Sequence, residues 1–228
     1  MEYRHELKFL VSEKQLELLR FKLNLIMKQD IHQQGDAYKI RSLYFDDFYD
    51  TCLRENESGV DRRKKYRIRI YNGSTDVIKL EKKIKFRGMT KKYSSIIKPD
   101  NCFNWIKSSD LSCMQCDSDL EKELYFMYKA KGMRPVTIVE YERTAFVEKR
   151  GNVRITFDRN ISCSTALKQF AEKTIPLIPL LPVGQHILEV KYDEYLPDYI
   201  KETMEIGTLQ RSTFSKYVYA RNYKNNLR

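Results

Sequence analysis

The sequence predicts an α+β domain in which eight antiparallel strands close into a barrel, with helices packed on its outside. Asn72-Gly73 and Gly151-Asn152 each lie between two strand-like segments, and such dipeptides favour tight hairpins between antiparallel neighbours. Amphipathic segments fill the longer intervals, and their apolar faces need a sheet to cover. The eight strand-like segments alternate polar with apolar residues or are rich in β-branched and aromatic residues: residues 2–10, 38–45, 64–72, 77–86, 91–98, 135–147, 152–159 and 186–192.

Four helices are expected in the intervals between strands. Ser12 and Gln15 form a capping box at the start of the first. Gly132 and Gly207 follow the second and third, and glycine commonly ends helices. The proline-rich segment from Ile175 to Gly184 is expected to be an extended loop, because three prolines preclude a regular helix. The expected helical ranges are about 12–28, 118–131, 197–206 and 212–223.

Composition indicates one domain over residues 1–228, since 42% of the residues are hydrophobic and no repeat or linker divides the chain. The net charge of +11 favours polyanionic partners such as phosphate chains, nucleic acid or acidic membrane. The charged N-terminus is unlike a secretory signal, and no apolar run approaches the roughly 18 residues that span a bilayer. We therefore expect a cytoplasmic protein without a membrane segment.

Cysteine and histidine usage argues against zinc, redox and histidine-based catalysis. The five cysteines lack the regular spacing of a disulfide framework, which fits a reducing compartment. Cys113 and Cys116 have the spacing of half a zinc site, but no second pair of ligands follows, so structural or incidental thiols are favoured. The chain has only three histidines. It also lacks the glycine-rich motifs of P-loop and dinucleotide-binding folds.

Alternation sends successive side chains of a strand to opposite faces, and on five predicted strands one face is mostly basic. A sheet with one solvated face would also alternate, but ordinary solvated faces mix their charges more evenly. Arginine suits phosphate because its planar guanidinium binds oxyanions bidentately. If this face lines a barrel, its repulsion requires a bound polyanion and a cation. The polar faces contain Arg4, Glu6 and Lys8; Arg67 and Arg69; Lys79, Glu81 and Lys83; Arg154, Thr156 and Asp158; Glu189 and Lys191.

An ordered set of motifs over nearly the whole chain resembles the VTC domain of polyphosphate polymerases, a branch of the triphosphate tunnel metalloenzymes (the CYTH-like superfamily). The resemblance implies an eight-stranded antiparallel tunnel, in agreement with the strand count above. The motifs are Arg4-His5-Glu6-Leu7-Lys8, Ser42-Leu43-Tyr44-Phe45-Asp46, Arg67-Ile68-Arg69, Glu81-Lys82-Lys83, Tyr141-Glu142-Arg143-Thr144-Ala145-Phe146, Arg154-Ile155-Thr156-Phe157-Asp158, Glu189-Val190-Lys191 and Ser215-Lys216-Tyr217.

The resemblance further implies transfer of the terminal phosphate of ATP onto a growing polyphosphate chain, with Mn²⁺ or Mg²⁺ required. Glu189 would hold the metal, and Ser215 and Lys216 would reach the substrate from a C-terminal helix. One of Lys91 and Lys92 would face the tunnel, with the register after Gly88 left open. The expected phosphate contacts are Lys8, Arg67, Arg69, Lys83, Lys91, Lys92, Tyr141, Arg143, Arg154, Lys191, Ser215 and Lys216, supported by Arg4, Glu6, Lys79, Glu81 and Asp158.

One departure from the wider superfamily bears on the activity. Its triphosphatases open with Glu-x-Glu-x-Lys, whereas Arg4 stands at the first glutamate position here. This favours the polymerase over triphosphatase or adenylyl cyclase activity. A tunnel hydrolase of triphosphate or short polyphosphate stays an alternative, as does a non-catalytic polyphosphate or nucleic-acid binder. Nucleic acid is disfavoured because aromatic residues such as Phe157 lie opposite the basic face, where they could not stack on bases.

Overall fold

The computed structural model describes residues 3–31, 33, 35–107, 115–205 and 208–225. Cys113, His32, Ile206 and Gly207, which the sequence analysis singled out, lie outside the described residues.

The described strands form one antiparallel sheet that contains eight strands of eight or more residues. Each coincides with a segment expected from alternation, and the predicted α+β fold class is confirmed. Three two-residue strands join the sheet as well: β2 (Lys28–Gln29), β9 (Ile178–Pro179) and β11 (Gln210–Arg211). The long strands are β1 (His5–Ser12), β3 (Tyr38–Asp46), β4 (Arg63–Tyr71), β5 (Ser74–Phe86), β6 (Met89–Ile96), β7 (Arg134–Glu148), β8 (Val153–Ser164) and β10 (Gln185–Tyr192).

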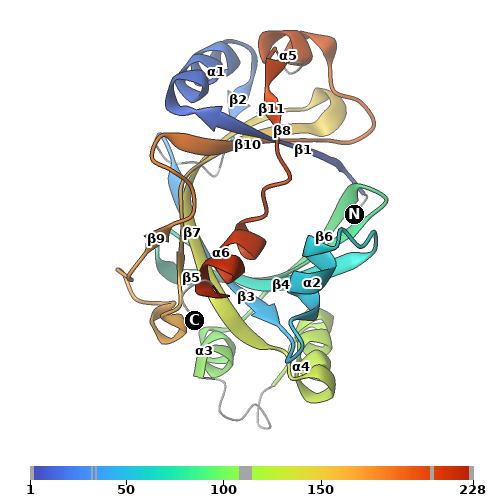
Figure 1. The fold of residues 1–228 in the computed structure, drawn as a ribbon, viewed down its shortest axis with the longest axis vertical. Helices are drawn as coiled ribbons and strands as arrows, with labels where there is room; N and C mark the ends of the chain where they lie inside the picture. The colour runs from blue at the N-terminus through green and yellow to red at the C-terminus, as the bar shows by residue number, and fades with distance from the viewer. Residues whose placement is uncertain (1–2, 32, 34, 108–114, 206–207, 226–228) are drawn as a thin grey trace.

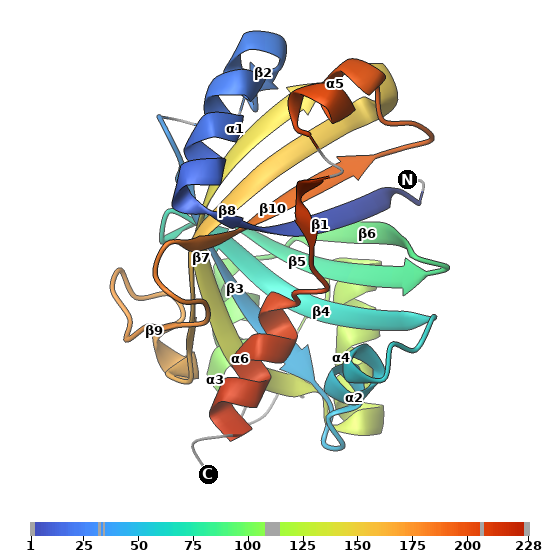
Figure 2. The same cartoon turned by 45° about the horizontal axis from the view of Figure 1, so that its top comes forward.

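The sheet curls into a ring but does not close as a regular barrel within the described residues. Its order is β1-β10-β8-β7-β3-β4-β5-β6, which brings β6 round towards β1 (Figures 1 and 2). The two edges meet at one isolated bridge, where Arg4 and Thr90 exchange two backbone hydrogen bonds of 2.9 Å. The expected closed barrel is therefore a tunnel-like sheet with a narrow seam. Beyond the bridge each edge strand follows the twist of its own neighbour, β10 or β5.

Four of the helices correspond to predicted ones. They are α1 (Glu13–Ile26), α4 (Asp119–Lys131), α5 (Asp198–Thr203) and α6 (Lys216–Asn225). The predicted capping box is present, since the Ser12 hydroxyl accepts from the Gln15 backbone N–H and the Gln15 side chain accepts from Ser12. Gly132 ends α4 in the left-handed region at φ +64°. None of the described helices is long and apolar enough to cross a membrane.

Two short helices were not expected: α2 (Thr51–Glu57) and α3 (Pro99–Lys107). No local capping motif marks the start of α2, because its first N–H groups are bound by carboxylates that precede it by several residues. Asp46 accepts from Cys52 and Leu53, and Asp47 accepts from Thr51. The signal for this helix is therefore a contact of the folded chain.

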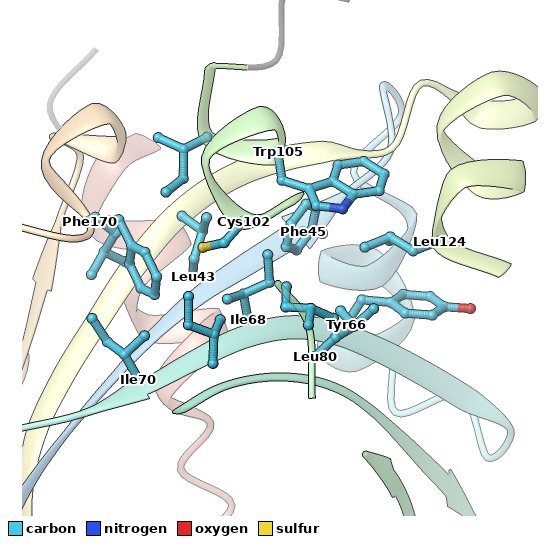
Figure 3. Packing of buried hydrophobic residues seen from close by; sticks show 14 of the residues in the cluster. Leu43, Phe45, Tyr66, Ile68, Ile70, Leu80, Cys102, Trp105, Leu124 and Phe170 are labelled. Carbon is cyan, nitrogen blue, oxygen red and sulfur yellow. The ribbon is translucent and has the colours of Figure 1, made fainter. Parts of the chain in front are cut away.

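The outer face of the sheet is apolar and is covered by helices. At one end α1 and α5 cover β1, β8 and β10 (Figure 1). At the other, α3 and α4 cover β3, β4 and β5, and Figure 3 shows Trp105 of α3 over Phe45, with ring centroids 5.4 Å apart. Helices outside the ring thus bury the apolar side of each strand and leave the polar side to the interior.

Helix α6 differs from the expectation, because it packs on the inner side of the sheet. Figure 1 shows it within the ring of strands, beside β7. Its Tyr217 and Ala220 join a buried cluster with Ile40, Tyr44 and Tyr141, which point inward from β3 and β7. The inner side therefore has an apolar patch at one place, and the apolar face of α6 covers it.

Candidate active site

Cross-strand register places the charged side chains of neighbouring strands beside one another on the concave side of the sheet, here called the inner face. Lys8 lies opposite Glu189, Glu189 opposite Thr156, and Asp158 opposite Arg143. The pattern continues through β3, β4, β5 and β6. Within the described residues, cations outnumber carboxylates on this face. The charged residues are Glu6, Lys8, Lys65, Arg67, Arg69, Lys79, Glu81, Lys83, Lys92, Arg143, Arg154, Asp158, Glu189 and Lys191.

The first of three ion-pair groups joins β1, β5 and β10. Lys83 Nζ donates to both carboxylate oxygens of Glu6, at 2.6 and 2.9 Å. Lys191 Nζ lies 2.5 Å from Glu189 Oε1, and Lys8 Nζ lies 3.5 Å from Glu6 Oε1 and 3.9 Å from Glu189 Oε2. Two carboxylates are thus held close together by three lysines.

Burial and mutual repulsion would raise the pKa of Glu6, but Lys83, Lys8 and Lys191 outweigh them and lower it. Burial would likewise raise the pKa of Glu189, and Lys191 and Lys8 hold it well below its usual range. Burial lowers the pKa of Lys83 to about 8, despite its contact with Glu6. This part of the inner face therefore contains ionised carboxylates and a lysine that loses its proton near neutral pH.

The second group centres on Glu81 of β5, whose side chain is only 1% exposed. Arg67 donates to Glu81 Oε2 from Nε at 2.8 Å and Nη2 at 2.7 Å, and Lys92 donates to Oε1 at 3.0 Å. Arg69 lies 3.5 Å from the same carboxylate and also donates to the Tyr141 hydroxyl at 3.2 Å. Burial opposes ionisation of Glu81, but Arg69 and Arg67 keep its pKa well below the usual range. One carboxylate therefore orients three cations.

The third group joins β7, β8 and α6. Arg143 makes a bidentate pair with Asp158, at 2.7 and 2.8 Å, and Lys216 of α6 lies 2.5 Å from Asp158 Oδ2. Both cations also lie over the Tyr141 ring, 5.2 and 4.7 Å from its centroid. Burial would raise the pKa of Tyr141, but Arg143 and Arg69 lower it. The ring and the carboxylate together fix these two cations.

The start of α6 meets further cations. The Ser215 hydroxyl accepts from Lys65 Nζ at 3.0 Å, and the Phe214 carbonyl accepts from Lys8 Nζ at 3.0 Å. A helix N-terminus favours anions, because its first N–H groups lack partners within the helix. Ser215 and Lys216 thus lie beside the inner face, where the sequence analysis expected a C-terminal helix.

Lys65 is an inner-face residue that the sequence analysis did not select. It has no ion pair with a carboxylate among the described residues, and it lies over the Tyr217 ring at 5.2 Å. Burial, then Lys8 and Lys83, hold its pKa well below the usual range. The signal was available, because Lys65 has the same parity on its strand as Arg67 and Arg69.

Lys91 corrects one expectation, since the structure places it on the outer face. Arg87 (φ +49°) and Gly88 (φ +75°) form a two-residue turn with left-handed conformations, which sets Lys83 opposite Lys92. Lys92 therefore faces inward, whereas Lys91 lies over the rings of Tyr3 and Tyr93, at 5.8 and 5.3 Å.

Three other expected residues have different surroundings. Arg4 lies at the seam, where it binds Asp193 at 2.6 Å and the Asn152 carbonyl. Arg154 pairs with Asp30 and approaches the Tyr38 hydroxyl at 3.4 Å. Lys79 is on the inner face over the Tyr71 ring, at 5.5 Å. These cations lie apart from the three ion-pair groups.

The donor set fits a divalent cation held mainly by substrate. No group of three or more His, Cys, Asp or Glu side chains that could hold a metal occurs in the part of the chain that the structure describes. Mg²⁺ and similar ions are commonly bound by one or two carboxylates together with phosphate oxygens and water. Glu189, an ionised carboxylate among cations, meets that requirement once a phosphate chain lies beside it.

A pocket of about 440 Å³ lies elsewhere, at the start of β3. It is lined by both signs of charge, including Asp36, Lys39, Glu142 and Arg159. Lys39 lies opposite Glu142, and Glu142 opposite Arg159, on the face away from the basic groups. The three groups above remain the better candidate site.

Comparison with known proteins gives one family. A family model described as the VTC domain matches residues 3–223. No curated protein sequence matches the chain.

Solved structures with low sequence identity share the fold. A proposed adenylyl cyclase from Hippeastrum with a dominant triphosphatase activity is 14% identical, with a TM-score of 0.55 and coverage of 98% of this chain and 96% of its own. A proposed adenylate cyclase from Bacillus halodurans is 12% identical, with a TM-score of 0.52 and coverage of 90% and 87%. A protein from Pyrococcus horikoshii is 16% identical, with a TM-score of 0.50 and coverage of 97% and 99%.

Proposed function

The chain belongs to the VTC domain family, and we propose that it is a polyphosphate polymerase that uses its inner face as the active site. In this reaction the terminal phosphate of ATP is transferred to the end of a polyphosphate chain, and ADP leaves. The observation that supports the proposal most strongly is the row of cations in register across the strands, oriented by a smaller number of buried carboxylates. Such a surface suits a ligand with many negative charges.

The chemistry requires positioning more than acid–base catalysis. Phosphoryl transfer passes through a loose transition state whose charge spreads over the oxygens of the transferred group. The nucleophile is an oxygen of the terminal phosphate, which is already ionised at neutral pH, so no strong general base is needed. The new P–O bond forms at the γ-phosphorus of ATP as the bond to the leaving ADP oxygen breaks.

The three ion-pair groups supply fixed positive charge for this step. Arg67 and Arg69 are held by Glu81, Tyr44, Ser42 and Tyr141 through side-chain hydrogen bonds. Cations that are oriented before the substrate binds stabilise developing charge with little reorganisation. We therefore assign phosphate contacts to the cations of these groups, with Arg143 and Lys216 on one side and Lys8, Lys83 and Lys191 on the other.

A divalent cation, Mn²⁺ or Mg²⁺, completes the proposal. When bound, it would neutralise charge on the phosphate oxygens and stabilise the departing diphosphate of ADP. Glu189 would hold it, at the expense of its contact with Lys191. In its absence Lys191 and Lys8 keep that carboxylate ionised.

The alternative function is hydrolysis of triphosphate or short polyphosphate, in which water replaces the phosphate acceptor. The Hippeastrum neighbour has triphosphatase activity, although at 14% identity it supports the fold alone. Both reactions need the same basic surface and differ in what attacks the phosphorus. A non-catalytic polyphosphate binder would share the surface and lack turnover.

The test is to incubate the purified protein with ATP and Mn²⁺ or Mg²⁺ and to resolve the products by gel electrophoresis and phosphorus NMR. The proposal predicts internal phosphates of long chains, and their loss in the double variant Arg67→Ala/Arg69→Ala. Free phosphate as the main product would identify a hydrolase. Binding of polyphosphate without turnover of ATP would identify a binding domain.

A further inference from the structure

Thr156 has a buried hydroxyl with no use in the fold. It lies in the middle of β8 on the inner face and is 2% exposed. Its Oγ1 atom has no hydrogen-bond partner among the described residues. Most buried polar groups are hydrogen-bonded, and one left without a partner destabilises a protein. A hydroxyl in this position therefore calls for an explanation beyond stability.

The neighbours of Thr156 do not satisfy it. On one side Ala145 of β7 lies opposite and has no polar side-chain atom. On the other side Glu189 of β10 lies opposite, and its carboxylate is engaged by Lys191 and Lys8. Along β8 itself, Asp158 is engaged by Arg143 and Lys216. The unpartnered hydroxyl thus lies between two of the three ion-pair groups.

Thr144 offers a direct contrast. It lies on the adjacent strand and is 1% exposed, and it is opposite Phe157 on the outer face. Its hydroxyl donates to the Asp36 carbonyl at 2.8 Å. A buried threonine of the same sheet that serves the fold is therefore hydrogen-bonded, which makes Thr156 the exception of the pair.

We propose that the Thr156 hydroxyl donates a hydrogen bond to a phosphate oxygen of the bound polyphosphate or ATP, between the groups of Glu189 and Asp158. This inference rests on the proposed function, because it assumes that phosphate oxygens occupy the inner face. The surrounding cations attract an oxyanion, and a hydroxyl gives it a directed donor without further charge to repel them. Thr156 is thus assigned as a phosphate-contact residue beside the carboxylate that would hold the metal.

Three variants test the assignment by two readouts, thermal unfolding and calorimetric titration with tripolyphosphate. Thr156→Val keeps the shape and removes the hydroxyl, so it should bind about 10- to 100-fold more weakly, the loss expected for a hydrogen bond to a charged group. Its melting temperature without ligand should equal or exceed that of the wild type, since a buried unsatisfied group is removed. Thr156→Ser should bind as the wild type does. Thr144→Val, the matched control, should melt lower and bind normally.

Each other outcome overturns the inference. Normal binding by Thr156→Val means that the hydroxyl contacts no phosphate, and a lower melting temperature with normal binding means that it serves the fold. If Thr156→Val does not fold, Thr156→Ala takes its place, and equal affinity of the Ala and Ser variants excludes the contact. If the wild type itself does not bind tripolyphosphate, the proposed function fails and the inference fails with it.

Discussion

Each buried carboxylate of the inner face is shared among several cations, and this sharing governs what single substitutions should do. Glu81 orients Arg67, Arg69 and Lys92, and Asp158 orients Arg143 and Lys216. Removal of a carboxylate would leave buried cations repelling one another, which is strongly destabilising. Removal of one cation leaves the carboxylate paired, so cation variants report on ligand binding with less damage to the fold.

Lys91 and Lys92 provide a matched pair for testing the inner face. Lys92→Ala should weaken tripolyphosphate binding by roughly 1 kcal/mol, about fivefold, since this partly exposed lysine faces inward beside Glu81. Lys91→Ala should bind as the wild type does, because Lys91 lies on the outer face. Calorimetric titration of both variants checks the prediction, and equal losses would show that overall charge, and not the inner face, determines affinity.

Lys83 predicts how binding depends on pH. Burial lowers its pKa from 10.5 to about 8, so in the free protein it loses its proton as the pH rises through about 8. A bound polyanion favours the charged form and raises this pKa, so binding should take up a proton above that pH and weaken as the pH increases. Titrations at about pH 9 in buffers of different ionisation enthalpy measure the uptake. Lys83→Arg, which stays charged, should show less uptake, and an unchanged value would exclude Lys83.

Glu189→Gln separates a metal ligand from a counter-ion, since it keeps the size of the side chain and removes its charge. As a ligand, Glu189 is needed for turnover but not for binding. The variant should therefore bind polyphosphate at least as well as the wild type and lose metal-dependent turnover by about a hundredfold or more. Glu142→Gln, on the outer face of β7, serves as the control. Near-normal turnover with the same metal dependence would reduce Glu189 to a counter-ion of Lys191.

Alternation in the sequence predicted most of the inner face correctly, and the exceptions have local causes. The parity of Arg67, Arg69, Lys79 and Lys83 on their strands was enough to place them together. The choice between Lys91 and Lys92 depended on the two-residue turn at Arg87 and Gly88, whose length the sequence left open. The unpartnered state of Thr156 could not be predicted, because it depends on Ala145 and Glu189 from two other strands.

At the scale of elements, the position of α6 is the main feature that the sequence could not provide. An amphipathic pattern shows that a helix has an apolar face, but not which side of a sheet that face covers. Here the decision rests on Asp46, which caps α2 and also accepts from the Tyr217 hydroxyl and, at 3.4 Å, from Arg221. One buried carboxylate thus ties the inner helix to β3 and keeps Lys216 near Asp158.

Tyr217→Phe tests this tie. The Tyr217 hydroxyl donates to Asp46 and accepts from Arg221 at 3.1 Å, so its removal should lower the free energy of unfolding by about 1–3 kcal/mol. Tyr219→Phe is the control on the same helix, because Tyr219 is 48% exposed. Urea denaturation of both variants gives the difference. Equal stability of the two would show that α6 is held by its apolar contacts alone.

At the scale of the whole molecule, the arrangement separates stability from binding. Three apolar clusters lie between the sheet and its helices, while the inner face collects cations whose charge exceeds that of the carboxylates among them. The seam at Arg4 and Thr90 was not predicted, because the meeting of the two edge strands depends on the accumulated twist of the sheet. A surplus of inward positive charge is a cost to the fold that a bound polyanion would relieve.

The most direct test of the polymerase assignment follows the fate of one phosphate. ATP radiolabelled at its γ-phosphate is mixed with unlabelled tripolyphosphate, Mn²⁺ and the purified protein, and the products are separated by length. Transfer to the chain end predicts label in tetrapolyphosphate and longer chains, with both the label and its transfer lost in Arg67→Ala/Arg69→Ala. Label found only in free phosphate, whatever the concentration of tripolyphosphate, would contradict the assignment and leave a hydrolase.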